Sequence, residues 1–256
     1  MLEAESRKSQ FCTGSGSAQG ERRACHQVSG VRSEACCDEA WEAAYSRFET
    51  PEREISKFLK RLRKMGADRW PRNAVILELF CGRGNGLHAL SRLGFTHLEG
   101  IDLSASLLAE YTGPGKSCIC DCRQLPFRGR SKDVVVIHGG LHHLRRLPDD
   151  LEQTLSEINR VLKDGGLLGI VEPWLTPFLS FVHAVCRNSA ARRLSKKVDA
   201  LATMIHYEQQ TYEQWLSHPQ KILGLLAKYF QADRLSFGWG KLIWVGRKKD
   251  GDSLIG

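Results

Sequence analysis

The chain has 256 residues, of which 42% are hydrophobic, and a formal net charge of +8 at pH 7. This length suffices for a substantial core, so one or two domains are expected. No apolar run approaches the roughly 20 residues needed to cross a bilayer, and the first residues lack the apolar centre of a signal peptide. We therefore expect a cytoplasmic protein without a transmembrane segment.

Residues 1–38 are rich in Ser, Gly, Gln, Arg and Glu and show no hydrophobic period, which predicts a disordered tail. The chain has nine cysteines but no secretory signal, so reduced thiols are expected rather than disulfides. The tail also lacks the C-x-x-C spacing that is typical of zinc sites, and we expect no metal site. The candidates that lack this spacing are Cys25, His26, Cys36 and Cys37.

Residues 39–72 are predicted to form helices that cover the rest of the fold. Thr50 followed by Pro51 indicates a helix start, because threonine can cap a helix and proline suits the first helical position. An earlier apolar stripe has helical spacing and could cover a ligand or simply pack on the sheet. It consists of Trp41, Tyr45 and Phe48.

Basic side chains are concentrated in two segments, residues 51–72 and residues 187–197. Charged helix faces are commonly solvated. Such patches can also attract RNA, an anionic membrane or an acidic substrate. No signature of an RNA-binding module accompanies them, so nucleic acid is possible as a partner but is not favoured.

The most informative segment is residues 75–90, VILELFCGRGNGLHAL. Its first six residues form a nearly continuous apolar run, as expected for a parallel strand that is covered on both faces. Glu78 lies near the end of this strand, where open α/β sheets bind ligands. The glycines that follow allow a tight turn, after which helical spacing resumes.

This turn does not fit a dinucleotide site, because the third glycine of G-x-G-x-x-G is replaced by Leu87. A carboxylate at Glu78 would also repel a pyrophosphate, whereas it would attract the ammonium of a methionine moiety and sit well beside a sulfonium. The segment therefore favours S-adenosylmethionine over a dinucleotide.

Further acids and polar clusters follow the next predicted strands. Asp102 ends the second strand, at the distance from the glycine turn where an acid can accept both ribose hydroxyls, and Ser104 then starts a helix. Asp121 follows the third strand and could hold an adenine amino group. The fourth strand leads into a His-Gly-Gly loop at His138, and the fifth ends at Glu172. Repeats of strand, polar end and helix predict a doubly wound parallel α/β sheet.

The five segments resemble the ordered motifs of class I S-adenosylmethionine-dependent methyltransferases, over about residues 73–173. These segments are ELFCGRG, GIDLS, CDCRQLPF, DVVVIHGGLHHL and RVLKDGGLLGIVEP. The resemblance is closest to the small-molecule, methyltransferase-11-like type. It implies a Rossmann-like fold, a methyltransferase activity and S-adenosylmethionine as the cofactor.

The resemblance also implies where the cofactor binds. Phe80 stands where a glycine is common, and we expect it to narrow the pocket. The residues carried over are Glu78, Phe80, Gly82 and Gly84 around the methionine end, Asp102 and Leu103 at the ribose, Asp121 and Cys122 at the adenine, and His138 at the floor of the pocket.

Residues 174–217 are too long for an ordinary connection and predict a helical insertion over the mouth of the sheet. Residues 218–249 predict a helix and two strands, which would complete a seven-stranded sheet with an antiparallel edge hairpin. Aromatic and aliphatic side chains of the insertion could form an apolar substrate chamber, with His183 and His206 orienting the acceptor. The apolar candidates are Trp174, Phe178, Phe181, Val182, Met204, Ile205, Tyr207 and Tyr212.

Methyl transfer from a sulfonium is an in-line displacement that depends on alignment and exclusion of water. An oxygen or carbon acceptor can also need a base. His142 and His143 are the first candidates, because imidazole titrates near neutrality and the loop follows the fourth strand. Glu172 is a rival base, although it could equally hold the insertion in place.

The leading hypothesis is methyl transfer to a small, partly apolar acceptor. One alternative is an RNA methyltransferase that uses the basic patches, in which case binding would weaken with salt. A second is a non-catalytic regulator that binds the cofactor without turning it over. The sequence contains no coiled-coil heptads that would specify an oligomeric state.

Overall fold

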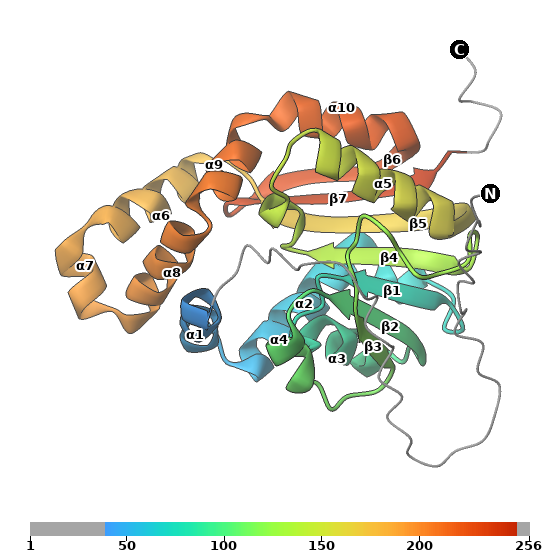
Figure 1. Cartoon of the computed structure of the whole chain (residues 1–256), viewed down its shortest axis with the longest axis horizontal. Coiled ribbons are helices and arrows are strands. Elements are labelled where there is room, and N and C mark those ends of the chain that lie inside the picture. The colour runs from blue at the N-terminus through green and yellow to red at the C-terminus, as the bar shows by residue number, and fades with distance from the viewer. Residues whose placement is uncertain (1–38, 250–256) are drawn as a thin grey trace, which may run out of the picture.

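The computed structural model describes residues 39–249. The predicted tail at residues 1–38, with its cysteines and histidine, lies outside the described residues. Within them, seven strands form one sheet in the order β3-β2-β1-β4-β5-β7-β6 (Figure 1). The strands are β1 (Val75–Leu79), β2 (His97–Asp102), β3 (Lys116–Ile119), β4 (Lys132–His138), β5 (Leu162–Pro173), β6 (Phe230–Gly238) and β7 (Lys241–Lys248).

The first five strands are parallel, whereas β7 runs antiparallel to both β5 and β6. The central strands β1 and β4 are almost entirely buried, which explains why their sequences are nearly continuous apolar runs. This arrangement confirms the predicted Rossmann-like, doubly wound sheet with an antiparallel hairpin at its C-terminal edge.

Helices cover both faces of the sheet (Figure 1). On one face, α2 (Pro51–Met65) and α3 (Asn85–Arg92) pack on the apolar cluster that includes Ile76 and Val136. On the other face, α5 (Asp149–Val161) and α10 (Pro219–Tyr229) contribute to a second cluster with Leu77 and Val135. Adjacent residues of one strand therefore point into two separate cores, as the alternation of side chains along a strand requires.

Four helices occupy most of the predicted insertion at residues 174–217. Figure 1 shows α6, α7 and α8 extending beyond the sheet, with the first helix, α1, beside α8. The bounds are α1 (Glu39–Phe48), α6 (Pro177–Arg187), α7 (Ser189–Leu194), α8 (Lys196–Tyr207) and α9 (Gln209–Ser217).

Two local predictions need correction. Helix α2 begins at Pro51 as expected, but the side chain of Thr50 makes no capping hydrogen bond, so the preorganised proline accounts for this helix start. The alternation of Cys118, Cys120 and Cys122 in the sequence predicts one strand over all three, but strand β3 ends at Ile119, so Cys120 and Cys122 lie beyond it. The thiol of Cys122 is buried, which raises its pKa to about 12. None of the helices within residues 39–249 has the length and apolar character needed to span a membrane.

Candidate functional site

A cavity of about 490 Å³ opens where β1, β2 and β4 end. Eight of the nine predicted cofactor residues contribute to its wall, and the exception is Gly84. Of the three predicted catalytic residues, only His143 lines the cavity. The predicted cofactor residues in the wall are Glu78, Phe80, Gly82, Asp102, Leu103, Asp121, Cys122 and His138.

The turn between β1 and α3 uses left-handed backbone conformations. Gly84 precedes α3 with φ of 77°, and a Cβ there would lie 2.1 Å from the ring of Tyr111. Phe80 also has a positive φ, 57°, which a non-glycine residue rarely adopts. Glycine adopts this conformation readily, so Phe80 occupies a backbone position that suits glycine. The Phe80 ring takes the space beside Gly140, where a Cβ would lie only 2.1 Å from it.

Glu78 lines the cavity, and its carboxylate is buried. Its side chain passes so close to α3 that a Cβ on Gly86 would lie 1.7 Å from Oε1. Oε1 lies 3.3 Å from Nδ1 of His138, whereas Oε2 is buried without a hydrogen-bond partner among the described residues. Burial, followed by the nearby charge of Glu54, raises the pKa of Glu78 well above its usual value. A cationic ligand would therefore satisfy both the unpartnered oxygen and the charge, so the site fits the ammonium or sulfonium of S-adenosylmethionine.

Asp102 connects the end of β2 to the glycine turn. Its Oδ2 accepts a hydrogen bond of 2.8 Å from the backbone N–H of Gly82, and its Oδ1 accepts one of 2.8 Å from the N–H of Ser104. Ser104 in turn caps α4 (Ala105–Ala109) by accepting from the N–H of Leu107. A carboxylate has about four acceptor positions, so two remain available for the ribose hydroxyls.

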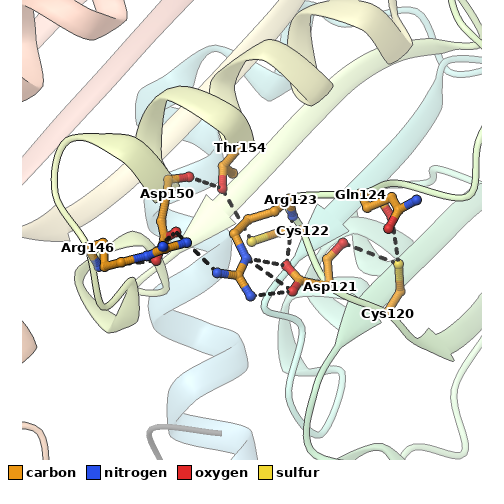
Figure 2. A network of polar contacts seen from close by, with 8 residues as sticks. All are labelled: Cys120, Asp121, Cys122, Arg123, Gln124, Arg146, Asp150 and Thr154. Carbon is orange, nitrogen blue, oxygen red and sulfur yellow. Dashed lines mark hydrogen bonds and ion pairs between the residues drawn. The ribbon is translucent and has the colours of Figure 1, made fainter. Parts of the chain in front are cut away.

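Asp121 lines the cavity and belongs to an ionic network there (Figure 2). Arg123 donates to both of its carboxylate oxygens, at 2.7 Å for the shortest contact, and also to Asp150 at 3.1 Å. Arg146 donates to the same Asp150 oxygen at 2.9 Å. Burial raises the pKa of Asp121, but the hydrogen bonds from Arg123 outweigh it and leave the pKa below its usual value. Asp121 is therefore a fixed carboxylate, and the sequence analysis did not anticipate the two arginines and Asp150.

Helices α1 and α2 also contribute side chains to the wall of the cavity. Glu54 of α2 accepts hydrogen bonds at Oε2 from Tyr45 at 2.7 Å and from the side chain of Asn85 at 2.6 Å. Tyr45 lines the cavity as expected for a cover residue, whereas Phe48 does not. Sequence reasoning missed Glu54 and Asn85, since nothing in a basic amphipathic helix distinguishes one inward acid.

His138 forms the floor of the cavity and is not a base. Its ring stacks on Phe58 of α2, with centroids 4.3 Å apart and planes 13° apart. Burial, and then the charge of Arg61, lowers the pKa of His138 well below its usual value. The neutral ring therefore acts as an apolar surface and a hydrogen-bonding group next to Glu78.

Of the predicted catalytic residues, His143 lies in the cavity wall, whereas His142 and Glu172 lie behind it. The loop after β4 forms a short 3-10 helix, η2 (Leu141–His143), which exposes His143 to the cavity. His142 is buried, and its Nδ1 lies 2.7 Å from Oε2 of Glu172. The other oxygen of Glu172 accepts from the N–H groups of Gly140 and Leu141, both at 2.8 Å. Glu172 thus holds the loop and His142 in place instead of facing the cavity.

Burial raises the pKa of Glu172, but His142 and the two backbone donors outweigh it and hold the pKa below its usual value. Glu172 is therefore ionised, and it has no access to an acceptor in the cavity. The sequence correctly placed Glu172 at the end of β5, but it did not show that the Glu172 side chain points away from the cavity.

The apolar chamber expected from residues 174–217 does not line this cavity. Phe178, Phe181 and Tyr207 are exposed because α6 and α8 extend beyond the sheet. Tyr212 is buried instead, and it hydrogen-bonds to Nε2 of His183 at 3.0 Å. His206 contacts Tyr207 rather than the cavity. The aromatic walls of the cavity come from other segments, namely Trp41, Tyr45, Phe58 and Phe80.

Comparison with known proteins agrees with this fold. Residues 77–170 match the family model described as a methyltransferase domain. This match agrees with the resemblance of the five ordered motifs to the class I S-adenosylmethionine-dependent methyltransferases.

Among relatives, the demethylmenaquinone methyltransferase of Staphylococcus aureus (strain MRSA252) is 38% identical over 106 residues, which are 38% of this chain and 42% of that protein. The chain thus spans less than half of the length of this relative.

Two solved structures show the same fold. The PH0226 protein from Pyrococcus horikoshii OT3 has a TM-score of 0.60 and 17% identity, covering 83% of this chain and 100% of that chain. The geranyl diphosphate C-methyltransferase from Streptomyces coelicolor A3(2), solved with Mg²⁺, geranyl diphosphate and S-adenosyl-L-homocysteine, has a TM-score of 0.53 and 14% identity. This structural match covers 76% of this chain and 78% of the Streptomyces coelicolor chain.

Proposed function

We propose that the protein transfers a methyl group from S-adenosylmethionine to a small, partly apolar acceptor. The observation that carries this proposal is the buried, unpartnered oxygen of Glu78 in a cavity that also contains Asp102 and Asp121. Three carboxylates along one wall suit a cationic nucleoside without phosphates, because they would repel a pyrophosphate.

The acceptor side of the cavity supports a partly apolar substrate. Trp41, Tyr45 and Phe58 provide apolar surface, whereas His143 and Arg145 add polar groups. Demethylmenaquinone, the acceptor named for the Staphylococcus aureus relative, combines a large apolar part with an oxygen-bearing ring. An acceptor of this chemical kind would fit the mixed character of the wall.

The cofactor, when bound, supplies an electrophilic methyl group. The protein's own contribution is to hold the ammonium through Glu78 and the ribose through Asp102, and to exclude water with α1 and α2. His143 at the wall, supported by the buried His142–Glu172 pair, would act on the proton of the acceptor.

The structure gives the RNA alternative no additional support. Several basic residues of the two patches are engaged in ion pairs, which reduces the free positive charge. Examples are Lys57 and Lys197 with Glu49, and Arg192 with Asp199.

Incubation with methyl-labelled S-adenosylmethionine and a fractionated cell extract tests the proposed function. Label should enter a small organic-soluble product. Label in RNA would favour the nucleic-acid alternative, and cofactor binding without any transfer would favour the non-catalytic regulator. Absence of cofactor binding would refute all three.

Replacing His143 with alanine should lower the rate of label transfer by about 100-fold while leaving cofactor affinity nearly unchanged, because positioned proton-transfer groups commonly contribute this much. His97, which is exposed at the other end of the sheet, provides the matched histidine control through His97→Ala. Transfer rates and calorimetric affinities are compared for both variants. A larger loss in affinity than in rate would contradict the assignment of His143 to the acceptor side.

Cofactor affinity should rise with pH through the raised pKa of Glu78. The protonated acid is favoured in the free protein, whereas a bound cation favours the carboxylate, so binding should release a proton. Calorimetry in two buffers of different ionisation enthalpy measures this release. An affinity that falls as the pH rises over this range would contradict the role of Glu78.

In the free protein, the raised pKa of Glu78 should make stability fall as the pH rises, whereas cofactor affinity rises with pH. A folded pKa that is raised contributes stability at low pH, which is lost as the pH rises through that pKa. Glu78→Gln should therefore make the free protein more stable than the wild type at alkaline pH while weakening cofactor binding. Melting temperatures across the pH range check this difference.

A further inference from the structure

Two imidazoles and a carboxylate meet at one oxygen atom beside the cavity. Glu208 lies between α8 and α9, far along the chain from η2. Its Oε2 is 3.5 Å from Nδ1 of His143 and 3.8 Å from Nε2 of His142. The ligand-type atoms of these three residues all lie within 4.8 Å of one another. His142 and Glu208 are buried and His143 is half-buried, so water competes little for this cluster.

The surrounding groups orient His142 and Glu208. Because Glu172 accepts a hydrogen bond from Nδ1 of His142, a neutral His142 ring has its lone pair on Nε2, the atom that faces Glu208. The indole N–H of Trp41 donates to Oε2 of Glu208 at 3.0 Å. Buried carboxylates and N–H donors that fix the direction of histidine and carboxylate ligands are typical of metal sites.

The charge of the cluster also favours a cation. Glu172 and Glu208 are both buried carboxylates, and they lie against the imidazoles of His142 and His143. The half-buried Lys241 contributes a single positive charge near both acids. A divalent ion would offset the remaining negative charge at the point where the three ligand atoms converge.

The two distances from Glu208 require only small adjustments, whereas the ligand atoms of His142 and His143, which lie within 4.8 Å of one another, would have to approach each other. Zinc binds histidine nitrogen and carboxylate oxygen at about 2.0–2.2 Å in tetrahedral geometry, which places ligand atoms about 3.3–3.6 Å apart. The two contacts of Glu208, at 3.5 and 3.8 Å, are within a few tenths of an ångström of this range. Three protein ligands leave at least one position open, and His143 faces the cavity.

We propose that His142, His143 and Glu208 bind a divalent transition-metal ion, with Zn²⁺ or Co²⁺ as suitable occupants, and that Glu172 is a positioning residue for His142. This departs from the expectation of no metal site, because the three residues share no spacing in the sequence. Binding of the ion is independent of the proposed function.

The role of the ion in catalysis rests on the proposed function. A hydroxyl acceptor at the open position would have its pKa lowered and would lose its proton to water. The acceptor oxygen would then form a bond to the methyl carbon, while the carbon–sulfur bond breaks and its electron pair stays on sulfur. His143 would serve as a ligand in this step, so the loss of transfer expected for His143→Ala is the same.

Titration of the full, untagged, metal-free chain with Co²⁺ tests the site through the visible spectrum of the bound ion. One equivalent should give bands of a nitrogen and oxygen site without a thiolate charge-transfer band. Glu208→Gln and His143→Ala should each weaken Co²⁺ binding by at least about tenfold, and Glu172→Gln by about 10- to 100-fold. Circular dichroism confirms that each variant is folded, and His97→Ala should bind like the wild type.

Two further measurements separate this site from other sources of signal. Replacing Cys25, Cys36 and Cys37 with serine should leave the spectrum unchanged, because the proposed ligands are not thiolates. Absence of Co²⁺ binding, a thiolate spectrum, or full affinity in folded Glu208→Gln and His143→Ala would overturn the proposal. Calorimetric binding of S-adenosylmethionine is measured in parallel, so a missing metal with intact cofactor binding would reject this site and leave the methyltransferase proposal standing.

Discussion

Asp102→Asn should weaken the binding of S-adenosylmethionine by about 10- to 100-fold. The substitution keeps the size of the side chain but removes the charge that strengthens hydrogen bonds to the ribose hydroxyls, each worth about 1.5–3 kcal/mol. It also turns an amide donor toward the N–H of Gly82 or the N–H of Ser104, both of which now donate to the carboxylate. The free energy of unfolding should therefore fall by about 1–3 kcal/mol.

Asp133→Asn is the matched control for this experiment. Asp133 also accepts from a backbone N–H, that of Val75 at 2.8 Å, but it lies at the start of β4 and thus at the opposite end of the sheet from the cavity. Asp133→Asn should lower the free energy of unfolding by a similar amount and leave cofactor affinity unchanged. Calorimetry at matched folded fractions compares the two variants. Equal cofactor affinity in the Asp102 and Asp133 variants would remove Asp102 from the ribose site.

Gly86→Ala should destabilise the protein and disturb the methionine end of the site together. A Cβ at position 86 would lie 1.7 Å from Oε1 of Glu78, whose carboxylate is 1% exposed and cannot move into solvent without disrupting the turn. Overpacking of this kind costs about 1–3 kcal/mol. The melting temperature should fall by about 2–4 °C for each kcal/mol, and cofactor affinity should fall because Glu78 is displaced.

Gly224→Ala provides the control for Gly86→Ala. Gly224 is exposed within α10, and a Cβ there would contact nothing within 4 Å. Since alanine favours helices over glycine by up to about 1 kcal/mol, this variant should be slightly more stable than the wild type. Thermal unfolding in the presence and absence of cofactor measures both effects. Wild-type stability and cofactor affinity in Gly86→Ala would show that Glu78 does not need the space that the missing Cβ of Gly86 leaves.

Much of the cofactor site was predictable because it depends on short-range patterns. Glu78, Asp102 and His138 each stand at or near the end of a strand that the apolar pattern identifies. The carboxyl ends of parallel strands meet at one edge of a sheet, so these residues must come close together without any knowledge of distances. Asp121 follows β3 at the same edge, although the strand itself ends sooner than expected.

The groups that the sequence did not indicate all come from elements packed on top of this edge. Glu54 reaches the cavity from α2, and Glu208 reaches the two histidines from the insertion. Arg123 lies two residues after Asp121 in the chain, but its ion pair with Asp150 depends on where α5 begins. Helical periodicity shows which face of a helix is apolar, but it does not show which single polar residue on that face meets a cavity.

The sequence by itself determined which strands end in polar residues, because side-chain alternation and chain direction are local properties. These residues in turn indicated the type of cofactor. Only the tertiary structure decided where each end group points. It turns Glu172 toward the loop, leaves Phe178 and Phe181 outside the cavity, and brings Glu208 to His142 and His143. These outcomes depend on how separate helices pack against the sheet, which is set by the sum of many weak contacts between distant segments of the chain.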